Sequence, residues 1–175
     1  SFVIGLIERL PKHSVVVYTS SQPDSAAFDR AWMENYGVLV IRDKSKVLLP
    51  TPRVASAVRK ILRRESISTV FFGAAAPLGL LAQGLRRAGA KRIVSLTHGH
   101  EVWWAKVWPF SWAMRRIGSG VDNLTYLGDF TRSQISRALT DSAANAMVKI
   151  APGIDTDHFA PRADAQTLRA ELGLS

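Results

Sequence analysis

The chain has 175 residues, of which 47% are hydrophobic, so it can form one compact domain with a real core. It contains no cysteine, which excludes disulfides and Cys-ligated metals, and its longest apolar run (73–82) is too short to span a bilayer. The 23 Lys and Arg residues outnumber the 14 Asp and Glu residues, which predicts an anionic partner: nucleic acid, an acidic membrane surface or a phosphorylated small molecule.

The first ten residues predict a helix, because Phe2, Leu6 and Leu10 recur every four positions. A domain that opens inside its first helix predicts that a strand precedes Ser1. Residues 163–172 predict another helix, at which the sequence stops. We therefore expect the chain to be a fragment of a longer protein.

Short runs rich in β-branched and aromatic residues predict strands at 13–20, 37–42, 68–74, 91–99, 122–128 and 145–153. Helical periodicity predicts helices at 52–64, 77–88, 103–118 and 130–139. Most of the strand runs are apolar throughout, as a parallel sheet covered on both faces requires. We expect an α/β fold with a doubly wound, Rossmann-like parallel sheet, whose ligands lie beyond the carboxyl ends of the strands. This rule selects the loops at 73–74, 98–101, 128–129 and 152–153.

The motif HGHE at residues 98–101 follows one of these strands, and three interpretations are open. His98 and His100 with the nearby carboxylate could bind a metal, but a glycine breaks the strand between them. The other histidines, His13 and His158, have no metal-ligand spacing to this motif. A strand-end histidine could instead be satisfied by a backbone partner. We favour the third interpretation, in which one histidine at the rim contacts a ligand.

The helix predicted at 52–64 carries an apolar stripe and a strongly basic face, formed by Arg53, Arg59, Lys60, Arg63 and Arg64. The simplest explanation is a solvated surface helix. A sharper hypothesis is docking on anionic lipid, where each basic residue contributes about 1 kcal/mol. Nucleic-acid binding is less favoured, because no aromatic residues interleave with the charges.

Aromatic residues are concentrated between 103 and 112, at Trp103, Trp104, Trp108, Phe110 and Trp112. Packing against the sheet explains some of them, and an amphipathic patch at a membrane interface or an acceptor groove could explain the others. Pro109 predicts that this region is two helical pieces or one kinked helix.

Two further segments could bind an anion. Asp129 or Thr131 could cap the helix predicted at 130–139, and Gly153 allows a close approach of the backbone to a ligand. The sequence lacks GxGxxG, GxxxxGK[ST] and GxSxG. Dinucleotide-dependent redox chemistry, P-loop hydrolysis and α/β-hydrolase chemistry therefore have no motif support.

Taken in order, HGHE after a strand, FTRSQI at the next helix and APGIDTDHFAP near the end resemble the N-terminal domain of retaining glycosyltransferase family 4 enzymes. These enzymes have two Rossmann-like domains that face each other across a cleft, the GT-B architecture. The segments HGHEVWW and RRIGSGVDNLTYLGDFTR look closest to the actinobacterial phosphatidylinositol mannosyltransferases that add the second mannose. The resemblance implies an acceptor-side domain at 1–153, with 154–175 as the hinge and start of a C-terminal donor-nucleotide domain.

By this resemblance the whole enzyme transfers mannose from GDP-mannose to phosphatidylinositol monomannoside, with retention, at the inner face of the plasma membrane. His98 matches the family histidine that faces the donor sugar, and Gly99, Gly153 and Asp155 match cleft positions. Ser45 and Lys46 fall near acceptor inositol-phosphate contacts. The membrane-docking residues implied are Arg59, Lys60, Arg63 and Arg64, to which we add Trp103 and Trp104.

No tightly bound cofactor, no protein-ligated metal and no nucleic-acid partner is expected. The family's glycine-rich loop would precede Ser1 and its C-terminal domain would follow the sequence, so we expect this fragment alone to be inactive. The alternatives are a basic α/β module that binds nucleic acid or another anionic ligand, and a family 4 enzyme with a different acceptor.

Overall fold

The computed structural model describes residues 2–153, together with residues 156 and 173. Short strands alternate with helices, which confirms the α/β class. Every predicted strand is found, in a shortened form: β1 (Val16–Ser20), β2 (Leu39–Asp43), β3 (Thr69–Phe72), β4 (Arg92–Leu96), β5 (Asn123–Tyr126) and β6 (Val148–Lys149).

The helices are α1 (Phe2–Ile7), α2 (Ser25–Tyr36), α3 (Pro52–Arg64), α4 (Ala82–Arg87), α5 (Glu101–Lys106), α6 (Phe110–Gly120), α7 (Asp129–Ile135) and α8 (Asp141–Asn145). Two short 3₁₀ segments, η1 (Leu78–Leu81) and η2 (Ser136–Ala138), adjoin α4 and α7. Helix α3 has the predicted bounds, and the region 103–118 is broken into two helices around Pro109, as expected. Helices α2 and α8 were not predicted. The helix predicted at 163–172 lies outside the described residues.

Helix α3 shows how local sequence determines an element. The Thr51 hydroxyl accepts a hydrogen bond from the Val54 amide (3.3 Å), and Pro52 occupies the first turn, where no amide hydrogen is needed. Val54 and Leu62 are buried, while the basic residues lie on the opposite side. The helix therefore presents its charged face outward.

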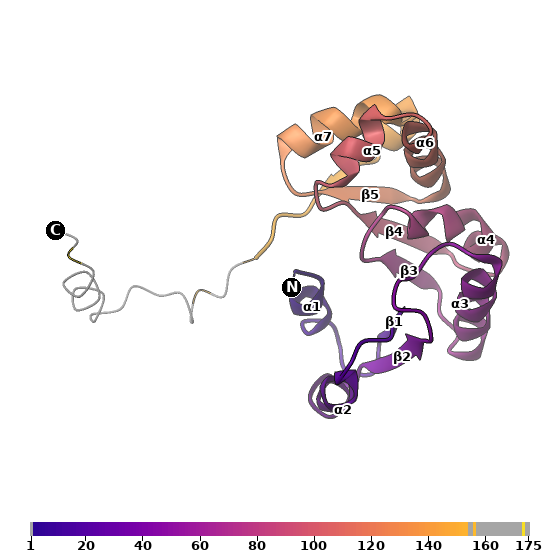
Figure 1. Cartoon of the computed structure of the whole chain (residues 1–175), viewed down its shortest axis with the longest axis vertical. Coiled ribbons are helices and arrows are strands. Elements are labelled where there is room, and N and C mark those ends of the chain that lie inside the picture. Colours follow the sequence, from indigo (N-terminus) through magenta and orange to yellow (C-terminus); the bar gives the residue numbers. More distant parts are fainter. Residues whose placement is uncertain (1, 154–155, 157–172, 174–175) are drawn as a thin grey trace.

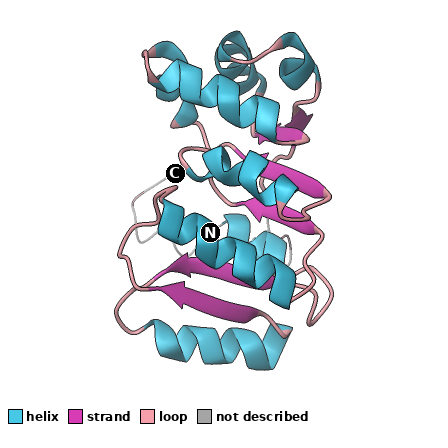
Figure 2. Ribbon diagram, turned by 90° about the vertical axis from the view of Figure 1, so that its right-hand side faces the viewer, coloured by secondary structure: helices cyan, strands magenta, loops and turns pink. Residues whose placement is uncertain are grey.

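All strand pairs are parallel, but the strands form two separate sheets. One has the order β1-β2 and the other has the order β3-β4-β5-β6. In Figure 1 the strands follow one another from β2 at the bottom to β5 near the top, with α3 and α4 along one side. Figure 2 shows the two groups of strands separated from each other, with helices packed beside them.

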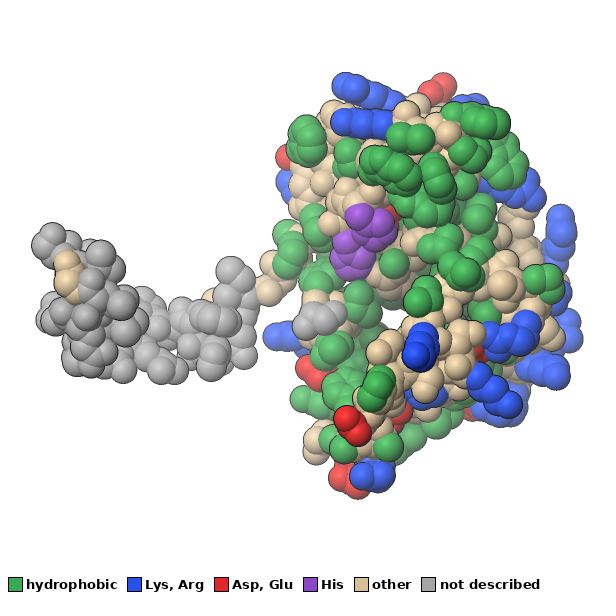
Figure 3. Space-filling view, in the orientation of Figure 1, with side chains coloured by type: hydrophobic (Ala, Val, Ile, Leu, Met, Phe, Trp, Pro, Cys, Tyr) green, Lys and Arg blue, Asp and Glu red, His purple; other side chains and the backbone are tan. Residues whose placement is uncertain are grey.

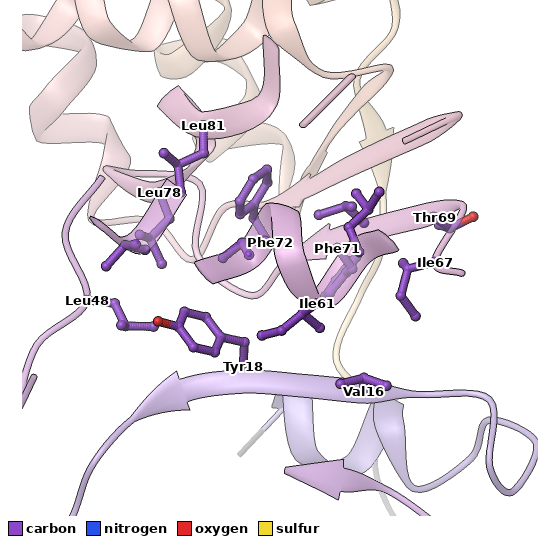
Figure 4. Close-up of a pocket in the computed structure, with 14 residues that line it drawn as sticks. Val16, Tyr18, Leu48, Ile61, Ile67, Thr69, Phe71, Phe72, Leu78 and Leu81 are labelled. Atoms are coloured by element: carbon purple, nitrogen blue, oxygen red, sulfur yellow. The ribbon is translucent and has the colours of Figure 1, made fainter. Parts of the chain in front are cut away.

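The gap between β1 and β3 contains an apolar groove of about 150 Å³. Val16 and Tyr18 of β1 line one wall, and Phe71 and Phe72 of β3 with Ile61 of α3 line the other (Figure 4). Among residues 2–153 no strand pairs with both β1 and β3. The expected continuous sheet is therefore present in two pieces, and the groove lies where one more parallel strand would fit.

The core lies between the larger sheet and the helices around it, in two apolar clusters. One includes Leu62, Phe72, Leu85 and Ile93, beneath α3 and α4. The other includes Met114, Ile117, Leu124 and Ile135, beneath α6 and α7. No helix in the described part of the chain has both the length and the hydropathy needed to cross a bilayer.

Candidate functional site

His98 lies just beyond the carboxyl end of β4, at the rim predicted to bind ligand. The preceding residue, Thr97, is buried, and its hydroxyl and its amide both donate to the Thr125 carbonyl, at 2.7 and 3.2 Å. These bonds hold the backbone beside β5 as far as position 97. The His98 side chain is half-buried, and its Nε2 lies 2.5 Å from the carbonyl oxygen of Gly73, which follows β3.

This contact determines which nitrogen of His98 carries a hydrogen. A carbonyl oxygen can only accept, so Nε2 must be the donor to Gly73. In neutral His98 the other nitrogen, Nδ1, is therefore an acceptor. The structure thus contains the backbone partner that one interpretation of the motif expected for a strand-end histidine. Because this partner binds Nε2, Nδ1 remains available for a second partner.

The loop after His98 is fastened by Glu101, the first residue of α5. The Glu101 side chain is fully buried, and its Oε2 accepts a hydrogen bond from the His98 amide at 2.9 Å. Its Oε1 lies 3.3 Å from Nε2 of the largely exposed His100, an ion pair when that histidine is protonated. Gly99 turns the chain with a φ of 105°, a conformation that a residue with Cβ rarely adopts. His100 and Glu101 therefore fasten the loop that positions His98.

The other rim loops differ in the groups that they could present to a ligand. Gly153 is exposed, and the space beside its Cα is open, whereas Asp155 lies outside the described residues. The expectation that Asp129 or Thr131 caps α7 is wrong. The cap residue is Gly128, which offers no side chain, and Oδ2 of Asp129 instead accepts from Lys149 Nζ at 3.1 Å.

A metal site has no geometric support in the portion of the chain that the structure describes. Among those residues no three His, Asp or Glu side chains converge as metal ligands would. His98 is committed to Gly73, and Glu101 to the amide of His98. The motif HGHE is thus a strand end and a turn.

A second polar cluster lies at the carboxyl ends of β1 and β2, centred on the buried Asp43. Two nitrogens of Arg53 bind its carboxylate, Nη1 to Oδ2 at 2.7 Å and Nη2 to Oδ1 at 2.8 Å. The Tyr18 hydroxyl donates to Oδ2, and the Ser45 amide donates to Oδ1 at 2.8 Å. Arg53 also donates to the Ser45 hydroxyl at 2.6 Å, so Ser45 is held in place, while the side chain of Lys46 is exposed.

The protonation of this cluster follows from its contacts. The hydrogen bonds from Arg53, and then those from Tyr18 and Ser45, hold the pKa of Asp43 far below its usual range. Burial, followed by the hydrogen bond to Asp43, raises the pKa of Tyr18 to about 12. Asp43 is therefore a permanent anion at neutral pH, neutralised by Arg53.

Comparison with known proteins identifies the family to which the chain belongs. The model of Glycosyltransferase Family 4 matches residues 1–158. The chain belongs to glycosyltransferase family 4.

This family 4 chain is similar to mannosyltransferases of three bacteria. It is 40% identical over 168 residues to the GDP-mannose-dependent alpha-(1-6)-phosphatidylinositol monomannoside mannosyltransferase of Mycolicibacterium smegmatis, covering 95% of this chain and 43% of that protein. The protein with the same name in Mycobacterium tuberculosis is 41% identical over 169 residues, covering 97% of this chain and 42% of the relative.

The monoacylated alpha-(1-6)-phosphatidylinositol monomannoside mannosyltransferase of Corynebacterium glutamicum, also GDP-mannose-dependent, is 34% identical over 177 residues, covering 100% of this chain and 45% of that protein. The chain thus spans less than half the length of each of these relatives.

The residues predicted to dock this family 4 domain on a membrane have different environments. Arg59, Lys60, Arg63 and Arg64 are all exposed on α3. Trp103 is half exposed, and its ring centroid lies 4.8 Å from that of Phe110. Trp104 packs edge-on against the same ring and against the apolar core. Trp104 is therefore the least available of the predicted docking residues.

Sequence reasoning missed Gly73 as the partner of His98, and it missed Asp43 as the shared partner of Tyr18 and Arg53. His98–Gly73 and Tyr18–Asp43 each join different strand–helix units, 25 positions apart, whereas Arg53–Asp43 joins α3 to the strand before it, 10 positions away. One signal was present: Asp43 is a carboxylate at the end of an apolar strand, where an ionised side chain needs a partner. The identity of that partner depends on the arrangement of strands.

Proposed function

We propose that this chain is the N-terminal, acceptor-side domain of a retaining mannosyltransferase that transfers mannose from GDP-mannose to phosphatidylinositol monomannoside in an alpha-1,6 linkage. One observation carries the proposal: mannosyltransferases named for this donor and acceptor match nearly the whole chain at 34–41% identity. The presence of His98 at the carboxyl rim of a parallel sheet, with Nδ1 as an acceptor, supports it.

In this proposal His98 binds the donor sugar and does not act as a strong base. With its Nε2 hydrogen directed to the Gly73 carbonyl, neutral His98 offers Nδ1 as an acceptor for a sugar hydroxyl. The same proposal assigns Gly99, Gly153 and Asp155 to the binding of the nucleotide sugar. Such a hydrogen bond orients the sugar, and orientation accounts for much of the rate in a group transfer.

The acceptor-side roles rest on Ser45 and Lys46. Arg53 and Asp43 fix the position of Ser45, so this loop is ordered before any ligand arrives. Lys46 presents an exposed ammonium group beside it, suited to the phosphate of an inositol phospholipid.

The same proposal assigns the protein to the cytoplasmic face of the plasma membrane as a peripheral enzyme. Arg59, Lys60, Arg63 and Arg64 are exposed on one helix. Arg64 is paired with Glu65, so the other three contribute most of the attraction to an anionic bilayer surface, about 3 kcal/mol. Trp103 contributes aromatic surface at the interface. The partners are then the nucleotide sugar, the glycolipid acceptor and the anionic membrane.

The test uses the full-length protein. It is incubated with GDP-mannose and phosphatidylinositol monomannoside, and the lipid product is analysed by mass and linkage. The expected product carries a second, alpha-1,6-linked mannose, and His98→Ala lowers the transfer rate by about 100-fold, since the sugar loses an orienting contact. Transfer only to another acceptor, or an unchanged rate in the His98 variant, would falsify the corresponding part of the proposal.

A further inference from the structure

The outer face of α6 combines an aromatic ring with two cations. Trp112, Arg115, Arg116 and Ser119 are all exposed and recur at the three- and four-residue spacing of one helix face. Met114 and Ile117 point into the core. None of these residues belongs to the His98 rim, to the Asp43 cluster or to the basic face of α3.

A cavity of about 210 Å³, wide open to solvent, lies between this face and α4, lined by Gln83, Trp112, Arg115, Arg116 and Ser119. The Arg116 guanidinium lies 5.7 Å from the centre of the Trp112 ring, in a cation–π contact. Its Nη2 donates to Oε1 of Gln83 at 3.4 Å. The volume is several times the roughly 30 Å³ that one water occupies, so a phosphate group fits. Arginine is well matched to phosphate, because its planar fork donates two parallel hydrogen bonds.

The charge of this cavity is not neutralised within residues 2–153. Neighbouring arginines have carboxylate partners, since Arg64 pairs with Glu65 at 2.6 Å and Arg86 with Asp122 at 2.8 Å. In the described structure no carboxylate pairs with Arg115 or Arg116. Two adjacent guanidinium groups without a counter-ion attract an external anion.

The cavity continues the basic surface of α3. Helix α4 packs against α3 on one side and against α6 on the other. Arg87, which is exposed, belongs to the helix that contacts both α3 and α6. Figure 1 shows the three helices along the same side of the sheets, and Figure 3 shows Lys and Arg side chains along that side.

We propose that the α6 face, comprising Trp112, Arg115, Arg116 and the cavity beside Gln83, binds the phosphate headgroup of an anionic membrane lipid. Trp108, 81% exposed just before α6, and Trp112, 58% exposed within it, enter the interfacial layer beside that headgroup. Large exposed indole rings next to arginine suit a lipid–water boundary, where an apolar ring and a charged group are both satisfied. The inference rests on the proposed function, because it adds a second membrane contact to that of α3.

The test measures binding of the intact protein to vesicles, without donor or acceptor. The vesicles contain phosphatidylcholine alone or phosphatidylcholine with phosphatidylglycerol. We expect Arg115→Gln/Arg116→Gln to weaken binding to the anionic vesicles by at least about 10-fold. The control, Lys12→Gln/Arg30→Gln, removes the same charge from exposed positions outside α3, α4 and α6 and changes binding by less than about twofold.

Tryptophan fluorescence gives a second readout. Anionic vesicles should shift the emission to the blue, and Trp112→Phe should remove part of that shift. Trp32→Phe should preserve it, because Trp32 is the buried residue on the inner side of α2. Unchanged vesicle binding by the arginine variant overturns the inference. Binding to single-stranded DNA is measured as well: if the arginine variant loses binding to DNA but keeps its binding to vesicles, the inference is also overturned.

Mannose transfer to a water-soluble acceptor is measured in parallel. Normal transfer by the arginine variant with weakened vesicle binding supports the inference. Normal transfer with unchanged vesicle binding overturns the inference alone. Absence of transfer from GDP-mannose to phosphatidylinositol monomannoside by the unmodified protein overturns the proposed function, whatever the vesicles report.

Discussion

The His98 ring donates through Nε2 to the carbonyl oxygen of Gly73, 2.5 Å away, so a residue that follows β3 orients a side chain that follows β4. The two loops therefore act as one unit at the rim of the larger sheet. The position of His98 depends on the parallel pairing of β3 with β4, in which Phe72 lies beside Ser95.

Two substitutions at His98 separate the roles of its nitrogens. An Asn side chain places a polar atom near the position of Nδ1, and a Gln side chain places one near that of Nε2. If the sugar is bound through Nδ1, His98→Asn should retain about 10-fold more transfer activity than His98→Gln. Rates in the intact protein with GDP-mannose test this, and the opposite order would assign the sugar contact to Nε2.

Glu101 should matter for stability far more than its neighbour His100. Glu101→Ala leaves the His98 amide without its acceptor and opens a space in a fully buried position. We expect the free energy of unfolding to fall by about 2–4 kcal/mol, against about 0.5 kcal/mol or less for the exposed His100→Ala. Urea unfolding of both variants measures the difference, and equal losses would show that the carboxylate does not fasten the loop.

The Asp43 carboxylate predicts a loss of stability in acid. Its folded-state pKa is lowered by Arg53, so its contribution is fully present above the unfolded pKa of about 3.9 and disappears as the pH falls toward the folded value. Asp43→Asn should therefore be less stable than the unmodified protein at pH 7. The difference between their free energies of unfolding should narrow steadily below about pH 4. Unfolding of both proteins measured across the acidic range tests this. A gap that does not depend on pH would contradict this account.

The raised pKa of Tyr18 predicts a loss of stability at alkaline pH. Its folded pKa of about 12 exceeds the usual value of about 10, so its stabilising contribution is complete below pH 10 and is lost as the pH rises through 12. Ultraviolet absorbance of tyrosinate should show a late step that Tyr18→Phe removes. Tyr36→Phe provides the control, and a late step that survives Tyr18→Phe would show that Tyr18 is not its source.

Gly99 and Gly128 form a matched pair for testing backbone strain. An added Cβ would meet open space at both positions, but φ is 105° at Gly99 and −149° at Gly128. Gly99→Ala should therefore cost about 1–3 kcal/mol or displace His98 and lower the transfer rate, whereas Gly128→Ala should cost only about 0.5 kcal/mol, because alanine caps a helix less well than glycine. Unfolding and activity of both variants would show this, and a neutral Gly99→Ala would mean that the turn relaxes without penalty.

The sequence was most informative where an element carries its own signals. The bounds of α3 follow from Thr51, Pro52 and the apolar stripe, all of which are local. Helix α2 was missed because Trp32 is its single buried residue, which leaves a weak periodic pattern. Gly37, whose φ of 65° ends the helix, was the signal that could have revealed it.

The candidate site was predictable to the extent that it follows from strand ends. The position of His98 at a rim came from the apolar strand before it and from the parallel-sheet rule. Its contact with Gly73 and the binding of Arg53 to Asp43 join segments separated along the chain, so they depend on register and packing. No local pattern encodes such distances.

The groove between β1 and β3 makes the described domain receptive to extended polypeptide. Each of these strands is hydrogen-bonded along one side only, and the walls between them are apolar. An extended segment entering there gains backbone hydrogen bonds and buries apolar side chains in a single step. The same edges can pair with a second copy of the domain at high concentration, so a preparation of this domain by itself has a built-in route to self-association.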